Sequence, residues 1–468
     1  MTQSAAGSAR RRFRKSPVIR RSRSVWRSRR VWRMRLAFWL GAGTIGLISV
    51  GFAAGADAAQ HAFFALRGSG SAGALLALAL PPAGFALSAW LAAAYFPASQ
   101  GSGIPQAIAA RQFEADADRG FLLSLRIAAG KILLTLLGLL SGGSIGREGP
   151  TVQVGAAIML AAGRFAGMAR ARGLILAGSA AGIAAAFNTP LAGIVFAIEE
   201  MGRTYQARTN GLVVTTVLLA GLASLGLTGD YTYFGTSEAA LTGPRDWLAV
   251  VVCGVGGGAF GALFSLSALG LLRRVRRWVA PAPRSRAVAA AAVCGLVVSL
   301  VGFVSDGATF GTGYEQARRA VEGSPLDLLF FAEKFVASLA SMVSGIPGGI
   351  FAPALAIGAG FGSTVGALLG AGAIAATLGM AGYFAGVVQA PMTAFVIILE
   401  MTGNHGAIVP LMLASMLGYG TARLVSPHPL YHTLSRDFAA DVIRRRRSLD
   451  RQAAPPSAQP DFAGGARR

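Results

Sequence analysis

The sequence is poor in charge for its length. Charged residues make up 13% of its 468 residues, whereas hydrophobic residues make up 53%. A soluble surface needs more charge, so this composition excludes two or three ordinary soluble domains. The two cysteines, Cys253 and Cys294, lie in apolar runs without paired spacing, and the four histidines form no ligand motif. We therefore expect no disulfide framework, no metal and no cofactor.

Acidic residues are also scarce, with 20 against 43 lysines and arginines, which gives a formal net charge of +23. The excess is concentrated at the ends of the chain. Thirteen basic residues precede residue 36 with no acid among them, and Arg444–Arg447 follow the last apolar segment. This placement indicates membrane topology and contact with anionic lipid headgroups, rather than nucleic-acid binding. We expect both termini on the cytoplasmic side and an even number of crossings.

Apolar segments long enough to cross about 30 Å of hydrocarbon recur along the chain. They are Leu36–Ala56, Ala74–Phe96, Gly211–Leu227, Leu248–Leu272, Val288–Val304, Ile350–Leu378 and Ala407–Leu424. Most of the 63 glycines lie inside these segments, as expected where membrane helices pack closely or are broken. The pattern predicts an all-α polytopic membrane protein.

Two motifs occur twice, about two hundred residues apart. Gly146-Arg147-Glu148-Gly149-Pro150 matches Gly349-Ile350-Phe351-Ala352-Pro353, and Asn188-Thr189-Pro190 matches Gln389-Ala390-Pro391. In the second motif the proline precedes a glutamate by nine residues in both copies, at Glu199 and Glu400. An internal duplication explains this order. We therefore predict a basic tail at 1–35, membrane repeats at 36–244 and 245–436, and a short disordered tail at 437–468.

Each Gly-x-x-x-Pro motif precedes a run suited to a helix, at 151–163 and 354–369, and so lies at a helix N-terminus. Free N–H groups and the positive end of the helix dipole make an anion site there without a buried full charge. A third loop, Gly101-Ser102-Gly103-Ile104-Pro105, precedes 106–111, and Ser102 adds a hydroxyl donor. Duplicated transporters place such broken helices near the bilayer midplane.

Two acidic positions suggest a mechanism. Ionised Glu148 would compete with an anion for the N–H groups of its own loop, and protonation would release the loop; a structural helix cap is the alternative. Glu200 follows Glu199 at the end of an apolar helix, where an ionisable group indicates a function. The residues alone leave open whether Glu199 takes part or is solvated at the helix end.

These motifs resemble the CLC family of chloride channels and proton-coupled chloride transporters. The three Gly-Pro loops reproduce the family's three anion-pathway motifs in order, and Asn188–Met201 and Pro429-Leu430-Tyr431 reproduce two more. The resemblance covers roughly residues 36 to 436. It implies the inverted-repeat CLC fold with re-entrant helices, and a homodimer with one pore per subunit in a bacterial inner membrane.

The resemblance also implies a set of binding residues. Chloride would be bound centrally by the hydroxyls of Ser102 and Tyr431 and by the N–H groups of Ile350 and Phe351. An outer site would comprise Gly146, Arg147, Glu148 and Gly149 with Phe351 and Ala352, and an inner site Gly101 and Ser102. The serine at position 102 resembles the residue that chloride-handling members have there, whereas proline at this position marks a preference for nitrate.

Glu148 would act as the gate and Glu200 as the inner proton acceptor, a residue that channel members typically lack. The resemblance therefore implies exchange of chloride for protons, with a passive chloride channel as the alternative. Many larger members carry cytoplasmic CBS domains, and we expect none here. An organic-anion transporter would need an arginine pair for a carboxylate, and an enzyme would need a nucleophile–base pair or a metal set. The sequence offers neither.

Overall fold

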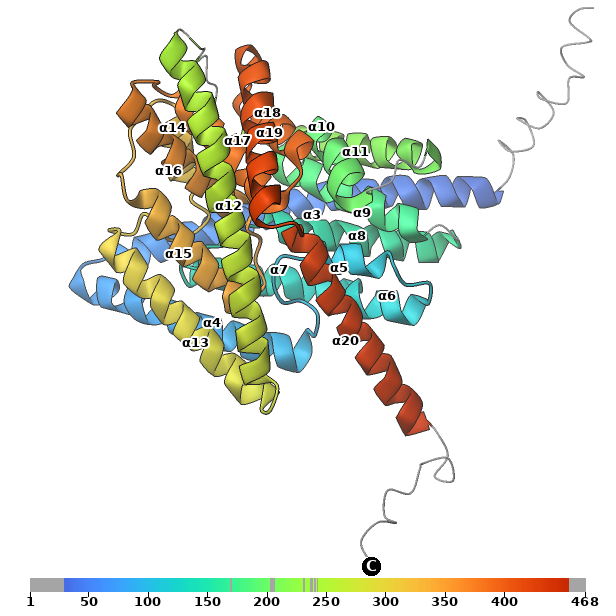
Figure 1. The fold of residues 1–468 in the computed structure, drawn as a ribbon. Helices are drawn as coiled ribbons and strands as arrows, with labels where there is room; N and C mark the ends of the chain where they lie inside the picture. The colour runs from blue at the N-terminus through green and yellow to red at the C-terminus, as the bar shows by residue number, and fades with distance from the viewer. Residues whose placement is uncertain are drawn as a thin grey trace, which may run out of the picture.

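The computed structural model describes residues 29–453, apart from 169–170, 203–206, 230–231, 236–238, 240 and 242. Most of the arginine-rich arm and the end of the C-terminal tail lie outside these residues. Almost every described segment is helical, as Figure 1 shows. The predicted all-α membrane fold is therefore confirmed.

The first half of the chain contains helices of uneven length. They are α3 (Arg29–Arg67), α4 (Ser71–Tyr95), α5 (Ile104–Ala110), α6 (Asp116–Leu122), α7 (Leu125–Leu140), α8 (Glu148–Ala166), α9 (Ala171–Phe187), α10 (Pro190–Phe196) and α11 (Ala207–Thr228). A single π-helical segment, η1 (Ala197–Gly202), directly continues α10.

The second half begins with the long helix α12 (Pro244–Val279). It continues with α13 (Pro283–Val304), α14 (Tyr314–Val321), α15 (Phe330–Val343), α16 (Phe351–Leu369), α17 (Ile374–Val388), α18 (Pro391–Thr402), the short 3₁₀ turn η2 (His405–Ala407), α19 (Ile408–Val425) and α20 (Leu430–Ala453). Helix α20 includes residues 437–453, which we assigned to a disordered tail. Ion pairs of Asp437 with Arg276 and of Arg446 with Asp118 join this extension to α12 and α6.

Eight segments of the described chain are long and apolar enough to cross a membrane. They include all the predicted spans, with two differences. The stretch Ile350–Leu378 is broken into α16 and α17 at Gly370 and Gly372, whose φ angles are 70° and 60°. The span 116–140 was missed, because Arg126 and Lys131 interrupt its apolar run.

The two halves repeat their backbone as well as their motifs. Asn188 and Gln389 both adopt the left-handed region, with φ of 57° and 58°, and each precedes a proline-initiated helix, α10 or α18. Helices α8 and α16 each have 19 residues and end at a left-handed glycine. The matching conformations agree with the predicted duplication; the boundary at Pro244 stays a prediction.

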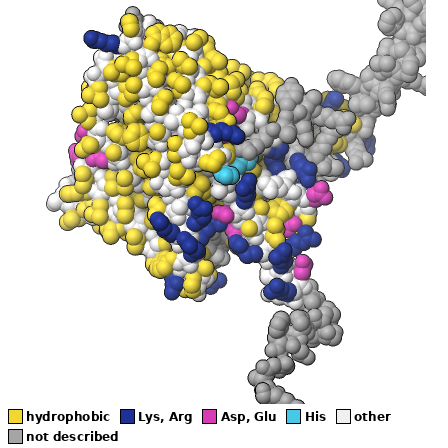
Figure 2. Space-filling view, viewed as in Figure 1, with side chains coloured by type: hydrophobic (Ala, Val, Ile, Leu, Met, Phe, Trp, Pro, Cys, Tyr) yellow, Lys and Arg dark blue, Asp and Glu magenta, His cyan; other side chains and the backbone are white. Residues whose placement is uncertain are grey.

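Basic side chains gather on one part of the surface. In Figure 2 they lie around the lower end of α12 and along α20, whereas the upper and left parts of this face are mainly hydrophobic. The lower end of α12 carries Arg273, Arg274, Arg276 and Arg277 beside Asp437 of α20. Such an arrangement is typical of the cytoplasmic boundary of a membrane protein.

Glycines allow α12, α17 and α19 to cross at close range. A Cβ atom added to Gly382 of α17 would lie 2.2 Å from the carbonyl oxygen of Cys253 in α12, and one added to Gly418 of α19 would lie 2.4 Å from the carbonyl oxygen of Gly382. Both neighbours are backbone atoms, which cannot turn aside. Close packing of this kind holds helices together in lipid, where the hydrophobic effect between them is absent.

We expect Gly382→Ala to destabilise the fold by about 1–3 kcal/mol, the usual cost of overpacking. Thermal unfolding in detergent measures the effect. Gly420→Ala in α19 is the matched control, because a Cβ there meets nothing within 4 Å. Equal stability of the two variants would show that the helices can separate without cost.

Candidate functional site

Three loops from distant parts of the sequence meet at the centre of the molecule. Gly146 and Gly349 exchange two backbone hydrogen bonds, each 2.7 Å long. Gly101 donates to the carbonyl of Ile346 at 3.2 Å and accepts from Gly348 at 3.1 Å. The three predicted anion loops are therefore joined directly by backbone pairing, which no pattern in the sequence predicts.

Each loop opens a helix, as predicted. Helix α5 begins after Gly103, α8 begins at Glu148 and α16 begins at Phe351. Gly103 has φ of 104°, a conformation that side chains with a Cβ rarely adopt. The first N–H groups of α8 and α16 have no partner within their own helices and face the junction of the loops.

Two hydroxyls from different elements lie at this junction. Ser102 in the first loop and Tyr431 in α20 are both buried, and their hydroxyls interact with each other. Neither forms a hydrogen bond of standard geometry. Buried hydroxyls without such a partner are uncommon and call for an explanation. A bound anion would explain them, because both hydroxyls can donate a hydrogen bond to it.

Small residues and aromatic rings fix the geometry around these hydroxyls. A Cβ atom at Gly149 would lie 2.3 Å from the Ser102 oxygen, so only glycine fits there. The Phe351 ring is held by Phe187, Phe196 and Phe384 at centroid distances of 6.3, 6.1 and 4.8 Å, and lies 5.9 Å from the Tyr431 ring. This packing positions the buried segment Ile350, Phe351 and Ala352 at the start of α16.

Glu148 lies at the same junction and is fully buried. Its carboxylate interacts with the N–H groups of Glu148 itself and of Ala352, and with the charge of Arg147. Neither N–H makes a hydrogen bond of standard geometry with it. A Cβ atom added to Gly146 would lie 2.2 Å from one carboxylate oxygen, so the carboxylate packs closely against the Gly146 backbone. The side chain is thus placed over the starts of α8 and α16 together, rather than as a simple cap of its own helix.

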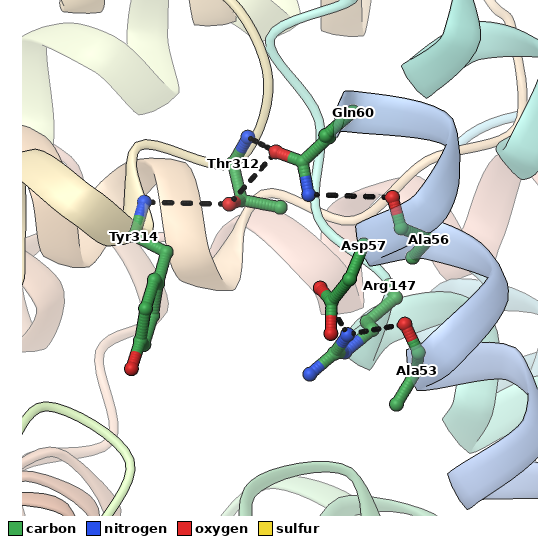
Figure 3. Close-up of polar contacts among 7 residues, drawn as sticks. All are labelled: Ala53, Ala56, Asp57, Gln60, Arg147, Thr312 and Tyr314. Carbon is green, nitrogen blue, oxygen red and sulfur yellow. Dashed lines mark hydrogen bonds and ion pairs between the residues drawn. The ribbon is translucent and has the colours of Figure 1, made fainter. Parts of the chain in front are cut away.

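Arg147 turns its side chain away from the loops toward α3. Its Nη1 donates to the Asp57 carboxylate and to the carbonyl of Ala53, both at 2.8 Å, as Figure 3 shows. The arginine side chain is buried, whereas the Asp57 side chain is 56% exposed. Arg147 therefore anchors the loop Gly146–Pro150 to α3.

Glu199 and Glu200 point in different directions from the π-helical segment η1. Glu199 accepts hydrogen bonds from the N–H groups of Met392 and Thr393, at 3.1 and 2.6 Å, and from the Thr393 hydroxyl at 2.7 Å. These groups belong to the start of α18. Glu199 is therefore a cap for a helix of the other repeat, which answers the question that the sequence left open.

Glu400 makes the reciprocal contact. Its carboxylate accepts from the N–H groups of Leu191 and Ala192 at the start of α10, at 3.0 and 2.7 Å. Each repeat thus caps a short helix of the other with the glutamate that follows its own proline by nine residues. The spacing was visible in the sequence, but its purpose was not.

We expect Glu199→Gln and Glu400→Gln each to lower stability by about 1 kcal/mol, because an amide offers one acceptor oxygen instead of two and no charge. Thermal unfolding in detergent measures both. The matched change at Glu315, an exposed acid in the first turn of α14, serves as the control. A loss no larger than that of the control would mean that the cross-repeat caps contribute nothing.

Glu200, the next residue of η1, is buried, with 2% of its surface exposed. His432, which follows Tyr431 in α20, lies beside it. The His432 Nε2 atom is 3.0 Å from the Glu200 carbonyl oxygen and 3.8 Å from its carboxylate. Glu200 therefore lies on the α20 side of the site, next to the residue that carries one of the two hydroxyls.

Two buried lysines were missed by the sequence reasoning. Lys131 of α7 donates to the carbonyls of Ser99 and Gly101, at 2.5 and 2.7 Å, and so holds the loop that carries Ser102. Lys334 of α15 donates to Thr309 and Gly311, at 2.9 and 2.8 Å. The two contacts are equivalent in the two halves.

The lysines reveal a third repeated motif. Gly311-Thr312-Gly313 corresponds to Gly101-Ser102-Gly103, and all four glycines have positive φ. In the second copy the hydroxyl and N–H of Thr312 both donate to the Gln60 side chain, at 3.2 and 2.9 Å (Figure 3). Only the first copy therefore keeps its hydroxyl without a standard partner.

The chain is similar to solved structures of one fold. One is a slow cyanobacterial Cl⁻/H⁺ antiporter, with a TM-score of 0.76, 24% identity, and coverage of 87% of this chain and 98% of that one. A CLC-type fluoride/proton antiporter has a TM-score of 0.70 at 23% identity over 85% and 97% of the two chains. A eukaryotic CLC transporter has a TM-score of 0.71 at 24% identity over 86% and 74%.

The family comparison covers the residues that build the site. The model for voltage-gated chloride channels matches residues 84–423, a range that contains all three loops and both glutamates but stops just short of Tyr431. Together with the helical architecture, this match identifies a multi-pass membrane transport protein rather than an enzyme. The chain belongs to the voltage-gated chloride channel family.

Proposed function

We propose that this protein exchanges chloride for protons. The observation that carries the proposal is the position of Glu148, whose carboxylate lies over the same N–H groups that would bind an anion. When Glu148 is ionised it occupies the anion position, and when it binds a proton its attraction to those groups falls. Chloride and a proton are thus exchanged at one place.

Chloride would be bound by the hydroxyls of Ser102 and Tyr431 and by the N–H groups of Ile350 and Phe351. The outer position would be formed by Gly146, Gly149 and Ala352, with Arg147 holding the loop, and the inner position by Gly101 and Ser102. Two buried hydroxyls without standard partners support the central position. None of these donors is a full charge, so an anion can be bound and released.

Glu200 would receive protons from the cytoplasmic side. Its burial and its place beside α20 support this role. The basic surface around α12 and α20 supports a cytoplasmic location for that side and for both termini. The family resemblance and the basic residues at both ends of the chain support a location in a bacterial inner membrane.

We further propose a homodimer. An exposed apolar face formed by α10, α11, α18 and α19 supports the dimer. The apolar side chains on this face do not pack into the core of the subunit and so are available to contact a second copy. They include Leu191, Leu218, Leu222, Met392, Val409 and Met416, whose exposed fractions lie between 46% and 64%. Cross-linking of single cysteines placed at position 222 in vesicles tests this assignment.

Reconstitution in liposomes tests the exchange directly. An outward chloride gradient should drive protons inward against their own gradient, which an external pH electrode detects. Chloride flux with no movement of protons would instead identify a passive channel of the same fold.

Ser102→Pro should raise nitrate flux relative to chloride and weaken proton coupling, because the substitution removes the hydroxyl and the N–H of that residue together. Anion flux into vesicles measures the ranking. Ser102→Ala is the matched control, because it removes the hydroxyl and keeps the N–H group. An unchanged anion ranking in Ser102→Pro would mean that Ser102 does not face the ion.

A further inference from the structure

A groove runs along the outer surface between α3 and α8, apart from the anion site. Its volume is about 970 Å³, and it is lined mainly by apolar residues. Small residues bring the two helices close together, because a Cβ added to Gly41 would lie only 3.0 Å from the Cβ of Ala162. Larger side chains form its walls, including Leu40 and Phe165, which are 70% and 81% exposed.

One end of the groove is cationic. Arg29 and Arg33 line it one helical turn apart, together with Trp32. Among the described residues, none that lines the groove is acidic, and neither arginine forms an ion pair with them. Trp32 contacts Trp39 edge to face, with ring centroids 6.4 Å apart. Tryptophans near the end of a membrane helix are typical of the level of the lipid headgroups.

We propose that this groove binds one anionic phospholipid. Its phosphate would lie between Arg29 and Arg33, and one acyl chain would lie over Gly41 and Ala162. The apolar part of the groove runs from Leu36 to Ile48, which is about 18 Å along a helix. That length is close to half of a hydrocarbon core of about 30 Å, so the groove fits a lipid of one leaflet.

Charge argues against other occupants. The arm at residues 1–28 is strongly basic and would be repelled by Arg29 and Arg33. A second copy of the chain that paired through this groove would bring the same two arginines together. A zwitterionic lipid would fill the apolar part but would leave the cationic end less well matched.

The full-length protein in neutral detergent provides the test. Native mass spectrometry counts retained lipids, and thermal unfolding with added phosphatidylglycerol or phosphatidylcholine of the same acyl chains measures their effect. We expect one retained phosphatidylglycerol per chain, a rise in unfolding temperature that phosphatidylcholine does not match, and no rise with inorganic phosphate alone.

Variants separate the two ends of the groove. Arg29→Gln with Arg33→Gln should weaken phosphatidylglycerol binding at least tenfold, whereas Arg284→Gln with Arg286→Gln, the same charge change outside the groove, should not. Ala161→Phe should fill the apolar part and lower retention of both lipids. Should Ala161→Phe fail to fold, the arginine pair still decides.

Three results would overturn the proposal. One is equal binding of the two lipids, and another is unchanged phosphatidylglycerol binding in Arg29→Gln with Arg33→Gln. The third is inorganic phosphate reproducing the effect, which would indicate a headgroup site without a lipid. In the second case, a change in the oligomeric state of the arginine variant would assign the groove to a second copy of the chain.

Discussion

Proton movement should stop in Glu148→Gln while chloride flux persists. The amide is nearly isosteric with the carboxylate but carries no charge, so nothing holds it over the N–H groups of α8 and α16. It also cannot take up a proton. We expect proton flux to fall to the background of empty vesicles and the dependence of chloride flux on external pH to flatten. Chloride and proton fluxes are measured on the same vesicles.

Glu148→Ala is the companion variant. It should lose proton movement in the same way, and its vacated volume should admit an additional anion at the outer position, which isothermal titration with chloride detects. A purely structural cap predicts a different outcome, in which both variants lose about 1 kcal/mol of stability and keep coupled transport in the folded protein. Coupled transport by Glu148→Gln would end the gating hypothesis.

The second large effect concerns Glu200. Glu200→Gln should keep chloride transport and abolish proton coupling, because it removes the proposed inner proton acceptor without altering the loops. The neighbouring acid gives a sharp comparison, since Glu199 is engaged with the N–H groups of α18. We expect Glu199→Gln to reduce stability but to leave the coupling ratio near that of the native protein.

Glu400→Gln completes this comparison, because it removes the equivalent cap from α10. If stability alone mattered, Glu199→Gln and Glu400→Gln would affect transport equally. Loss of coupling in Glu199→Gln with coupling retained in Glu200→Gln would reverse the assignment of the two acids.

The sequence predicted the elements of the site that are local in the chain. Glycine and proline specify the loop conformations and the starts of α5, α8 and α16, because both residues act through their own backbone angles. The repeat also identified Glu199 and Glu400 by their common spacing. What the pattern could not predict is which partner each acid meets, since the contacts cross between the repeats.

The missed residues share a different cause. Lys131 and Lys334 lie inside otherwise apolar helices, and their meaning depends on carbonyl groups of loops that are remote in sequence. The Thr312 copy of the first loop was overlooked because the following helix differs: Tyr314 and Glu315 replace Ile104 and Pro105. The loop Gly311-Thr312-Gly313 keeps the backbone conformation of the first copy, but the residues that follow it no longer show the Ile-Pro pattern.

Glu199 and Glu200 are neighbours in the π-helical segment Ala197–Gly202. Neighbouring positions on an ordinary helix are about 100° apart, so two consecutive acids cannot share one face. The sequence alone does not say which of them faces the interior. Only the packing of α10 and η1 against α18 and α20 decides it.

Coupled exchange requires one anion path to carry chloride and protons in opposite directions. It can be tested in vesicles with equal chloride on both sides and a more acidic exterior, with chloride followed by a selective electrode at clamped zero voltage. We expect net chloride efflux against the gradient that this efflux itself creates, driven by inward protons and absent in Glu148→Gln. No net chloride movement in the native protein, together with rapid chloride flux once a chloride gradient is imposed, would contradict it.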